Sequence, residues 1–380
     1  MKLDSKRNYG IDALRILAMF FIAILHVFGH GGITTSLTGL PQYVAKFIGL
    51  AVNCAVDVYA IISGFVAYTD APKKLKTSKF LTIWTQVFTY SFIIALGVFA
   101  ISHVSPKITT MGLKELIRRA LPITSNAYWY FSAYVPVLIL APWINKFLSK
   151  LSRKEATQLA ATLFGTFSVF VLIASKIAPA DAFSLGYGYS ALWLLVLYVI
   201  GAWMKKCDVT SRIKTSAAWI TLAVSVAITE ILRLIGVGGI SSYTSPTIVI
   251  NALALVIIFA KWSPAQTATK LIKFFAPAAF GVYLIHDNDH IRSYLISRLG
   301  SWIVSLNRGG WLAVPIALAA ALAILIVCLL IEKLRLTLFK VLRINDLINF
   351  VGGKIDNMHK KLEEKFNVLE EKENDSTTGS

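Results

Sequence analysis

The stretch Ile11-Asp-Ala-Leu-Arg-Ile-Leu-Ala-Met-Phe-Phe-Ile-Ala-Ile-Leu-His26 is apolar except for Asp12, Arg15 and His26. Within residues 9–29 it has the length that a helix needs to cross the ~30 Å hydrocarbon core of a bilayer. Ionisable side chains inside such a helix are costly, so each needs a partner or a function. The segment therefore predicts a membrane-spanning helix and makes these three residues candidates for a site.

The rest of the chain has the same apolar character. Its 380 residues are 56% hydrophobic and only 15% charged, whereas soluble domains carry about 25% charged residues. The fold class that we predict is all-α, a polytopic membrane helix bundle of about ten transmembrane helices. We place these helices at residues 9–29, 44–68, 80–102, 127–148, 157–175, 187–204, 215–236, 246–260, 274–297 and 311–332.

The formal net charge of +18 is explained by topology. With ten spans, 22 Lys and Arg residues before position 351 lie on the side that both termini share, and 7 lie on the other side. The positive-inside rule then places both termini in the cytoplasm of a multi-pass plasma membrane protein. The excess of basic residues orients the chain in the membrane and contacts anionic membrane lipids. We therefore expect no nucleic acid as a partner.

Two segments outside the spans have patterns of their own. In the external segment 103–126, apolar and charged residues alternate at near-helical spacing, which predicts a short helix in the outer headgroup plane. Residues 1–350 are predicted to form the transmembrane domain, and residues 351–380 a charged cytosolic tail.

The first span separates its polar residues by depth. Asp12 lies one helical turn before Arg15, and the two could simply neutralise each other near the inner interface. His26 lies near the outer end, where it is either solvated or a general base acting near neutral pH. His26 and His30 have the i,i+4 spacing of two metal ligands, but no third ligand is assignable, so we expect no metal.

Other spans also carry polar residues that must line a cavity or contact a substrate. Five ionisable residues lie in the seven positions from His286 to Arg292. Aromatic residues at the start of span 127–148 suit either a membrane-interface belt or stacking on a sugar. The residues that we expect around an acceptor-side cavity are Asp57, Trp129, Tyr130, Glu230, Arg233, Tyr283, His286, Asp289 and Arg292.

The inner end of the bundle has a different character. Lysines in the turn after the second span can bind phosphate as point charges. This end therefore suits a phosphate-bearing cytosolic donor, whereas the outer end suits an external acceptor. The residues that we expect to bind the donor are Arg15, Ser63, Lys73, Lys74 and Lys76.

Four stretches, in chain order, resemble motifs of the acyltransferase-3 family, whose members are integral-membrane enzymes that acylate extracytoplasmic sugars from an acyl-CoA donor. The stretches are Asp12-Ala-Leu-Arg15 with ten residues from Arg15 to His26; Asp57-Val-Tyr-Ala-Ile-Ile-Ser-Gly-Phe65; Tyr128-Trp-Tyr-Phe-Ser-Ala-Tyr134, running to Ala141-Pro-Trp-Ile-Asn145; and Gly281-Val-Tyr-Leu-Ile-His286. The resemblance implies that Arg15 and His26 take part in catalysis, with His26 either removing the proton of the acceptor hydroxyl as a general base or assisting acyl transfer through an intermediate. Asp12, one helical turn before Arg15, is included among the catalytic candidates.

The chain departs from this family in two respects. Many members have an Arg-x-x-Arg motif entering the third span, where this chain has lysines, which lack the bidentate fork of arginine. Some members also carry an extracytoplasmic esterase-like domain, whereas this chain ends in a short tail. We therefore expect it to acylate its acceptor directly or to pass the acyl group to a separate partner protein.

The resemblance implies an O-acetyltransferase that takes acyl-CoA, in the first instance acetyl-CoA, as co-substrate and binds no cofactor. Its acceptor would be an extracytoplasmic polysaccharide or a lipid-linked sugar. The alternative is a proton-coupled transporter, because intramembrane acids and histidines also form proton relays. A third reading, a membrane scaffold or sensor, predicts that His26 is dispensable.

Overall fold

The computed structural model describes residues 7–71, 74–105, 110–119, 121–123, 125, 127–178, 181–306 and 310–378. Within these ranges the chain folds into helices and contains no strand, which confirms the predicted all-α class. Eight helical segments are long and apolar enough to cross a membrane. They are α1 (Tyr9–Gly29), α3 (Gly39–Val52) with α4 (Ala55–Ala67), α5 (Thr77–Val104), α7 (Trp129–Lys150), α8 (Arg153–Phe164) with η1 (Gly165–Phe170) and α9 (Val171–Ile177), α12 (Thr215–Leu234), α14 (Gln266–Phe275) with η4 (Ala276–Ala278) and α15 (Ala279–His286), and α18 (Ala313–Val341).

Two further segments fall on predicted spans but are not among these eight. The turns η2 (Ala182–Ser184) and η3 (Gly186–Gly188) lead into α10 (Ala191–Lys206) with a bend of 80°. If the turns and α10 are taken together as one bent segment, they form a ninth span. The apolar helix α13 (Pro246–Lys261) has only 16 residues. The remaining helices are α2 (Ile33–Ser36), α6 (Leu113–Arg119), α11 (Val209–Arg212), α16 (Asp289–Ile291), η5 (Arg292–Ile296), α17 (Ser297–Ser305) and α19 (Ile344–Thr378).

The predicted ninth span, residues 274–297, is wrong as a single helix. Helix α15 ends at His286, and α16 starts a new helix at Asp289. The break has a local cause, because the side chain of Asn288 caps α16 by accepting a hydrogen bond from the His290 amide at 3.1 Å. The polar residues of this segment therefore lie in a turn and a second helix.

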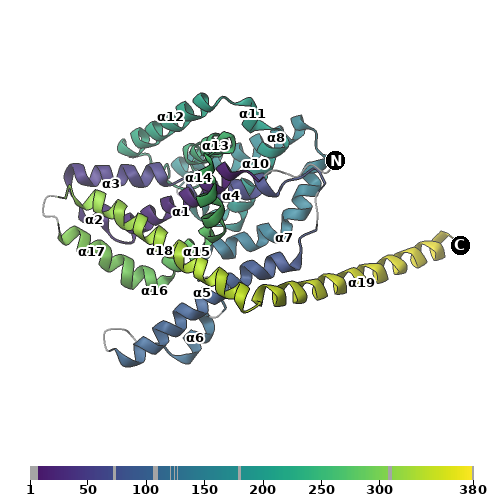
Figure 1. Cartoon of the computed structure of the whole chain (residues 1–380). Coiled ribbons are helices and arrows are strands. Elements are labelled where there is room, and N and C mark those ends of the chain that lie inside the picture. The colour runs from purple at the N-terminus through teal and green to yellow at the C-terminus, as the bar shows by residue number, and fades with distance from the viewer. Residues whose placement is uncertain are drawn as a thin grey trace.

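The centre of the bundle is packed through small residues. A Cβ atom on Gly64 of α4 would lie 1.9 Å from the Tyr198 carbonyl oxygen of α10, and one on Gly201 of α10 would lie 2.0 Å from the Ile61 carbonyl oxygen of α4. Only glycine permits this approach, which brings the two backbones into direct contact. Figure 1 shows α4, α10 and α13 in the middle of the body.

A fully buried acid joins three helices. Glu332 of α18 accepts hydrogen bonds from Gln86 at 3.0 Å and Tyr90 at 2.6 Å, both on α5, and pairs with Arg335 at 2.5 Å. Its side chain fills the space beside Gly281 of α15, where an added Cβ would lie 2.6 Å from its Cγ. This network fixes α15 against α5 and α18.

The last helix, α19, begins before residue 351, where the predicted cytosolic tail starts, and continues into that tail. Helix α19 begins at Ile344, and Figure 1 shows its far part extending away from the body. Asp356 accepts a hydrogen bond from the Thr77 amide at the start of α5 at 3.2 Å, and Glu363 pairs with Lys74 at 2.6 Å. The helix is therefore attached to the segment that enters α5.

Candidate functional site

A cavity of about 150 Å³ lies where α1 and α15 end and where α7 begins. We call this the His30 end of the bundle. A pair of hydrogen bonds positions the chain here, because Tyr128 donates to the Leu284 carbonyl at 2.8 Å and accepts from Asn288 at 3.0 Å. The cavity is lined by Met19, Ile22, Leu25, His26, His30, Val56, Tyr59, Trp129, Tyr130, Tyr189, Tyr243, Tyr283, Asp287 and Arg292.

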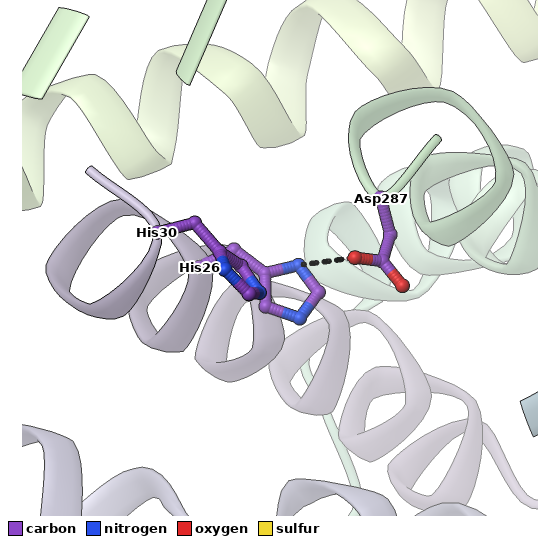
Figure 2. A group of neighbouring side chains, drawn as sticks. All are labelled: His26, His30 and Asp287. Carbon is purple, nitrogen blue, oxygen red and sulfur yellow. Dashed lines mark ion pairs between the residues drawn. The ribbon is translucent and has the colours of Figure 1, made fainter. Parts of the chain in front are cut away.

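His26 is held by groups at the end of α15. Its Nδ1 lies 3.0 Å from Nε2 of His286. The same nitrogen lies 3.4 Å from Oδ1 of Asp287 (Figure 2). His286 is buried, and its Nδ1 lies 2.5 Å from the Val282 carbonyl oxygen. A carbonyl can only accept, so His286 carries its proton on Nδ1 and, when neutral, accepts at Nε2. His26 then donates from Nδ1, which leaves the lone pair of its Nε2 available as a base.

A chain of ion pairs begins at Asp287, beside His26, and ends on helix α6. Arg292 bridges Asp287 at 3.0 Å and Asp289 at 2.6 Å, and Arg119 of α6 reaches Asp289 at 2.7 Å. Glu115 pairs with Arg119 at 2.7 Å. The hydrogen bond from Arg118 lowers the pKa of Glu115 to about 2, so this acid stays charged at neutral pH. The short helix α6, which the sequence predicts, is thereby connected to the carboxylate beside His26.

The same corner contains three groups of metal-ligand type. Ligand atoms of His26, His30 and Asp287 all lie within 4.8 Å of one another (Figure 2). Asp287 supplies the third group that the sequence spacing could not assign. However, Arg292 donates to the same carboxylate at 3.0 Å, and its positive charge opposes a divalent cation there. The arrangement is better suited to proton transfer than to metal binding.

Aromatic rings form the opposite wall of the cavity. The ring centroid of Trp129 lies 4.5 Å from that of Tyr189 and 6.4 Å from that of Tyr243. Tyr283 accepts a hydrogen bond from the Tyr130 amide at 3.2 Å. The Tyr130 hydroxyl itself is buried and has no hydrogen-bond partner within the described residues. A buried hydroxyl without a protein partner is costly unless a water or a ligand pairs with it.

The predicted catalytic residues of α1 fall into two groups. Asp12 pairs with Arg15 at 2.9 Å and with Arg7 at 2.5 Å, near the start of α1. Arg15 precedes His26 by eleven positions, which separates them by about 16 Å along the helix. Arg15 and Asp12 therefore do not line the cavity.

A row of tyrosines lies between these two groups. Tyr59 donates to the Arg15 carbonyl at 3.0 Å, and Ser63 donates to the Tyr59 carbonyl at 2.9 Å. The rings of Tyr59 and Tyr130 are 6.4 Å apart, and those of Tyr130 and Tyr134 are 5.9 Å apart. Uncharged aromatic side chains thus extend from Arg15 to the cavity.

Most of the predicted acceptor-side residues lie at or next to the cavity. Trp129, Tyr130, Tyr283 and Arg292 line it, and His286 and Asp289 contact residues that do. Asp57 is buried beside the lining residue Val56, where its Oδ1 accepts from Trp193 at 3.2 Å.

Four further predicted residues lie elsewhere, and a fifth falls outside the described residues. Glu230 and Arg233 are outside the lining and pair with each other at 2.6 Å, because their i,i+3 spacing on α12 makes each the nearest partner of the other. Lys74 is exposed and paired with Glu363. Lys76 immediately precedes α5, and Lys73 lies outside the described residues.

Sequence reasoning missed Tyr59, Tyr189 and Tyr243 as lining residues. Tyr189 and Tyr243 lie in turns between helices, and no spacing rule relates them to span 127–148. The one available signal was the aromatic density of the segment Phe183-Ser-Leu-Gly-Tyr-Gly-Tyr189.

The fold and the site define a multi-pass membrane protein with a pair of histidines, His26 and His286, beside a cavity at one end of a helical bundle. A family model described as an acyltransferase domain matches residues 8–333. The chain belongs to the acyltransferase-3 family and is a membrane acyltransferase. No curated protein and no solved structure matches the chain.

Proposed function

We propose that the protein moves an acyl group, in the first instance acetyl, from cytosolic acyl-CoA to a hydroxyl of an extracytoplasmic envelope or exopolysaccharide sugar. The observation that carries this proposal is the pairing of His26 with His286, which leaves Nε2 of His26 free to accept a proton. The acyltransferase family supplies the class of reaction.

The transfer proceeds by general-base catalysis. Nε2 of His26 takes the proton of the acceptor hydroxyl, and the oxygen attacks the thioester carbonyl. A C–O bond forms, the C–S bond breaks, and the departing sulfur takes the proton from His26. Asp287, at 3.4 Å, stabilises the transient imidazolium. The unpaired Tyr130 hydroxyl supplies a hydrogen bond to the oxyanion of the tetrahedral intermediate.

The donor enters from the other end of the bundle. The distribution of basic residues supports a cytosolic location for the end of the bundle where α1 begins, which we call the Arg15 end. Arg15 binds phosphate of the CoA, and the lysines before α5 attract it electrostatically. The flexible pantetheine arm then lies along Tyr134, Tyr130 and Tyr59, which brings the thioester to the cavity. The acceptor is the sugar itself or a separate acyl-carrying protein.

The test is transfer of label from radiolabelled acetyl-CoA in sealed membrane vesicles with the cytosolic face outward. Wild type is compared with His26→Ala and with His103→Ala, a control on α5 whose ring lies against Phe99 and does not line the cavity. We expect label in the lumenal glycan with wild type and the control, and loss of at least 100-fold in His26→Ala. Equal labelling by all three proteins would remove His26 from the chemistry. Absence of CoA release by wild type in the presence of glycan would contradict the transfer itself.

A further inference from the structure

The segment between α9 and α10 has an unusual backbone. Phe183, Ser184 and Tyr187 adopt left-handed conformations, with φ of 63°, 52° and 56°. A residue with a side chain avoids this region at a cost of about 1–2 kcal/mol. Three such residues in one turn persist only where the surroundings determine the conformation, and such strain concentrates at functional sites.

Hydrogen bonds and close packing hold this turn in its conformation. The carboxylate of Asp181 accepts from the Leu185 amide at 3.0 Å and from the Gly186 amide at 2.7 Å, and Leu185 is fully buried. Gly188 has φ of 105°, and a Cβ there would lie 2.4 Å from Cβ of Tyr243. Ser190 caps α10 by accepting from the Trp193 amide at 3.2 Å. The turn is therefore fixed at its beginning, middle and end.

The fixed turn presents one aromatic side chain to the cavity. The ring of Tyr189 lies 4.5 Å from that of Trp129 and 5.1 Å from that of Tyr243, and the Trp129 and Tyr243 planes differ by only 14°. All three residues line the cavity that contains His26. Tyr189 remains 54% exposed, so part of its surface is available to a ligand.

We propose that Trp129, Tyr189 and Tyr243 form an acceptor subsite that binds the apolar face of an uncharged pyranose ring. The faces of aromatic rings carry negative potential and attract the weakly positive C–H groups of a sugar face. Arg292, the cation of the cavity wall, is already neutralised by Asp287 and Asp289, so the subsite does not select an acidic sugar. This inference rests on the proposed function, because it names the ring whose hydroxyl His26 deprotonates.

The same turn contains a matched control. Tyr187 lies two positions before Tyr189 and is 65% exposed, but it does not line the cavity. If the tyrosines of this turn serve only to anchor it at the membrane interface, the two substitutions should have the same effect. If Tyr189 contacts the acceptor, only its substitution should weaken acceptor binding.

The test uses the purified full-length protein in lipid nanodiscs, where both ends are accessible. The probe is envelope polysaccharide from the source cells, freed of its esters by alkali, with labelled acetyl-CoA as donor. We expect Tyr189→Ala to raise the acceptor KM about tenfold and leave the KM for acetyl-CoA unchanged. Tyr189→Phe retains the ring and should stay within about threefold of wild type. Tyr187→Ala should match wild type in both constants.

Two results would overturn the subsite. One is an unchanged acceptor KM in Tyr189→Ala, and the other is an equal rise in Tyr187→Ala. In both cases transfer by wild type and its loss in His26→Ala would leave the proposed function standing. Absence of transfer to the polysaccharide by wild type would contradict the proposed function and the subsite together.

Discussion

In the proposed mechanism His26 and His286 act as a single base, because the second imidazole selects the tautomer of the first. The hydrogen bond from His286 to the Val282 carbonyl orients its ring and makes Nε2 an acceptor. Nδ1 of His26 donates to that nitrogen, so proton uptake is directed to Nε2 of His26. On the proposed mechanism, His286 controls which nitrogen of His26 reacts without itself contacting the substrate.

Replacing His286 by phenylalanine should separate this effect from binding. The change keeps a buried ring but removes the acceptor, so His26 loses its fixed tautomer. We expect kcat to fall about 100-fold while the KM for acetyl-CoA stays within about twofold. Steady-state kinetics on the purified protein measure both constants. A rise in KM with kcat intact would contradict the tautomer argument.

Tyr130→Phe removes only the unpaired hydroxyl. If this hydroxyl stabilises the oxyanion, kcat should fall about 100-fold with little change in either KM. Because the hydroxyl has no partner within the described residues, the melting temperature should not fall. Loss of stability without loss of kcat would show that the hydroxyl serves folding.

Removal of metal ions should leave the activity intact. His26, His30 and Asp287 are close enough to suggest a metal site, but Arg292 places a positive charge on the same carboxylate. Dialysis against a chelator, followed by the transfer assay, should retain full activity, and added Zn²⁺ should not increase it. Loss of activity that Zn²⁺ restores would assign these residues to a metal.

At the scale of elements, α6 is attached to the site through one arginine. Arg119 is 18% exposed and reaches Asp289, whereas Arg118 is 57% exposed and pairs with Glu115 alone. A partly exposed ion pair contributes up to about 1 kcal/mol. Arg119→Ala should therefore lower kcat by about three- to tenfold and speed amide hydrogen exchange in α6. Arg118→Ala is the matched control, and an equal effect of both would rule out the connection through Asp289.

The elements differ in how far the sequence predicts them. The bounds of α1 agree with the predicted span 9–29, because the apolar run and the polar residues around it mark both ends. The ninth predicted span fails at Asn288, whose capping role depends on a hydrogen bond that apolar length does not report. The turn at 181–190 could not be predicted, since left-handed Phe, Ser and Tyr residues have no sequence signature.

The candidate site shows the same division. His26 and Arg292 follow from the cost of ionisable groups in apolar segments. The partnership of His26 with His286 joins residues 260 positions apart, and the wall of Tyr189 and Tyr243 depends on the packing of two turns. Neither the histidine pair nor the aromatic wall can be inferred before the fold is known. Glu230 and Arg233 were expected at the cavity for the same energetic reason, but a neighbouring partner satisfies each of them on α12 itself.

For the whole molecule, Glu332 is the residue whose loss should matter most for folding. Glu332→Ala leaves Arg335 without its buried partner and leaves Gln86 and Tyr90 without an acceptor. Breaking a buried pair in this way costs about 3–5 kcal/mol. We expect a large fall in the melting temperature of the detergent-solubilised protein, and a smaller one for Glu332→Gln, which keeps an acceptor. Equal melting temperatures for wild type and Glu332→Ala would contradict this role.

The row of tyrosines between Arg15 and the cavity has an electrical consequence. Moving one elementary charge across a membrane costs about 2.3 kcal/mol for every 100 mV. On the proposed route the phosphates stay at the Arg15 end, a neutral acyl group goes out, and the hydroxyl proton returns on the neutral thiol. No net charge crosses, so a cell could decorate its outer surface at the same rate whether its membrane is energised or depolarised.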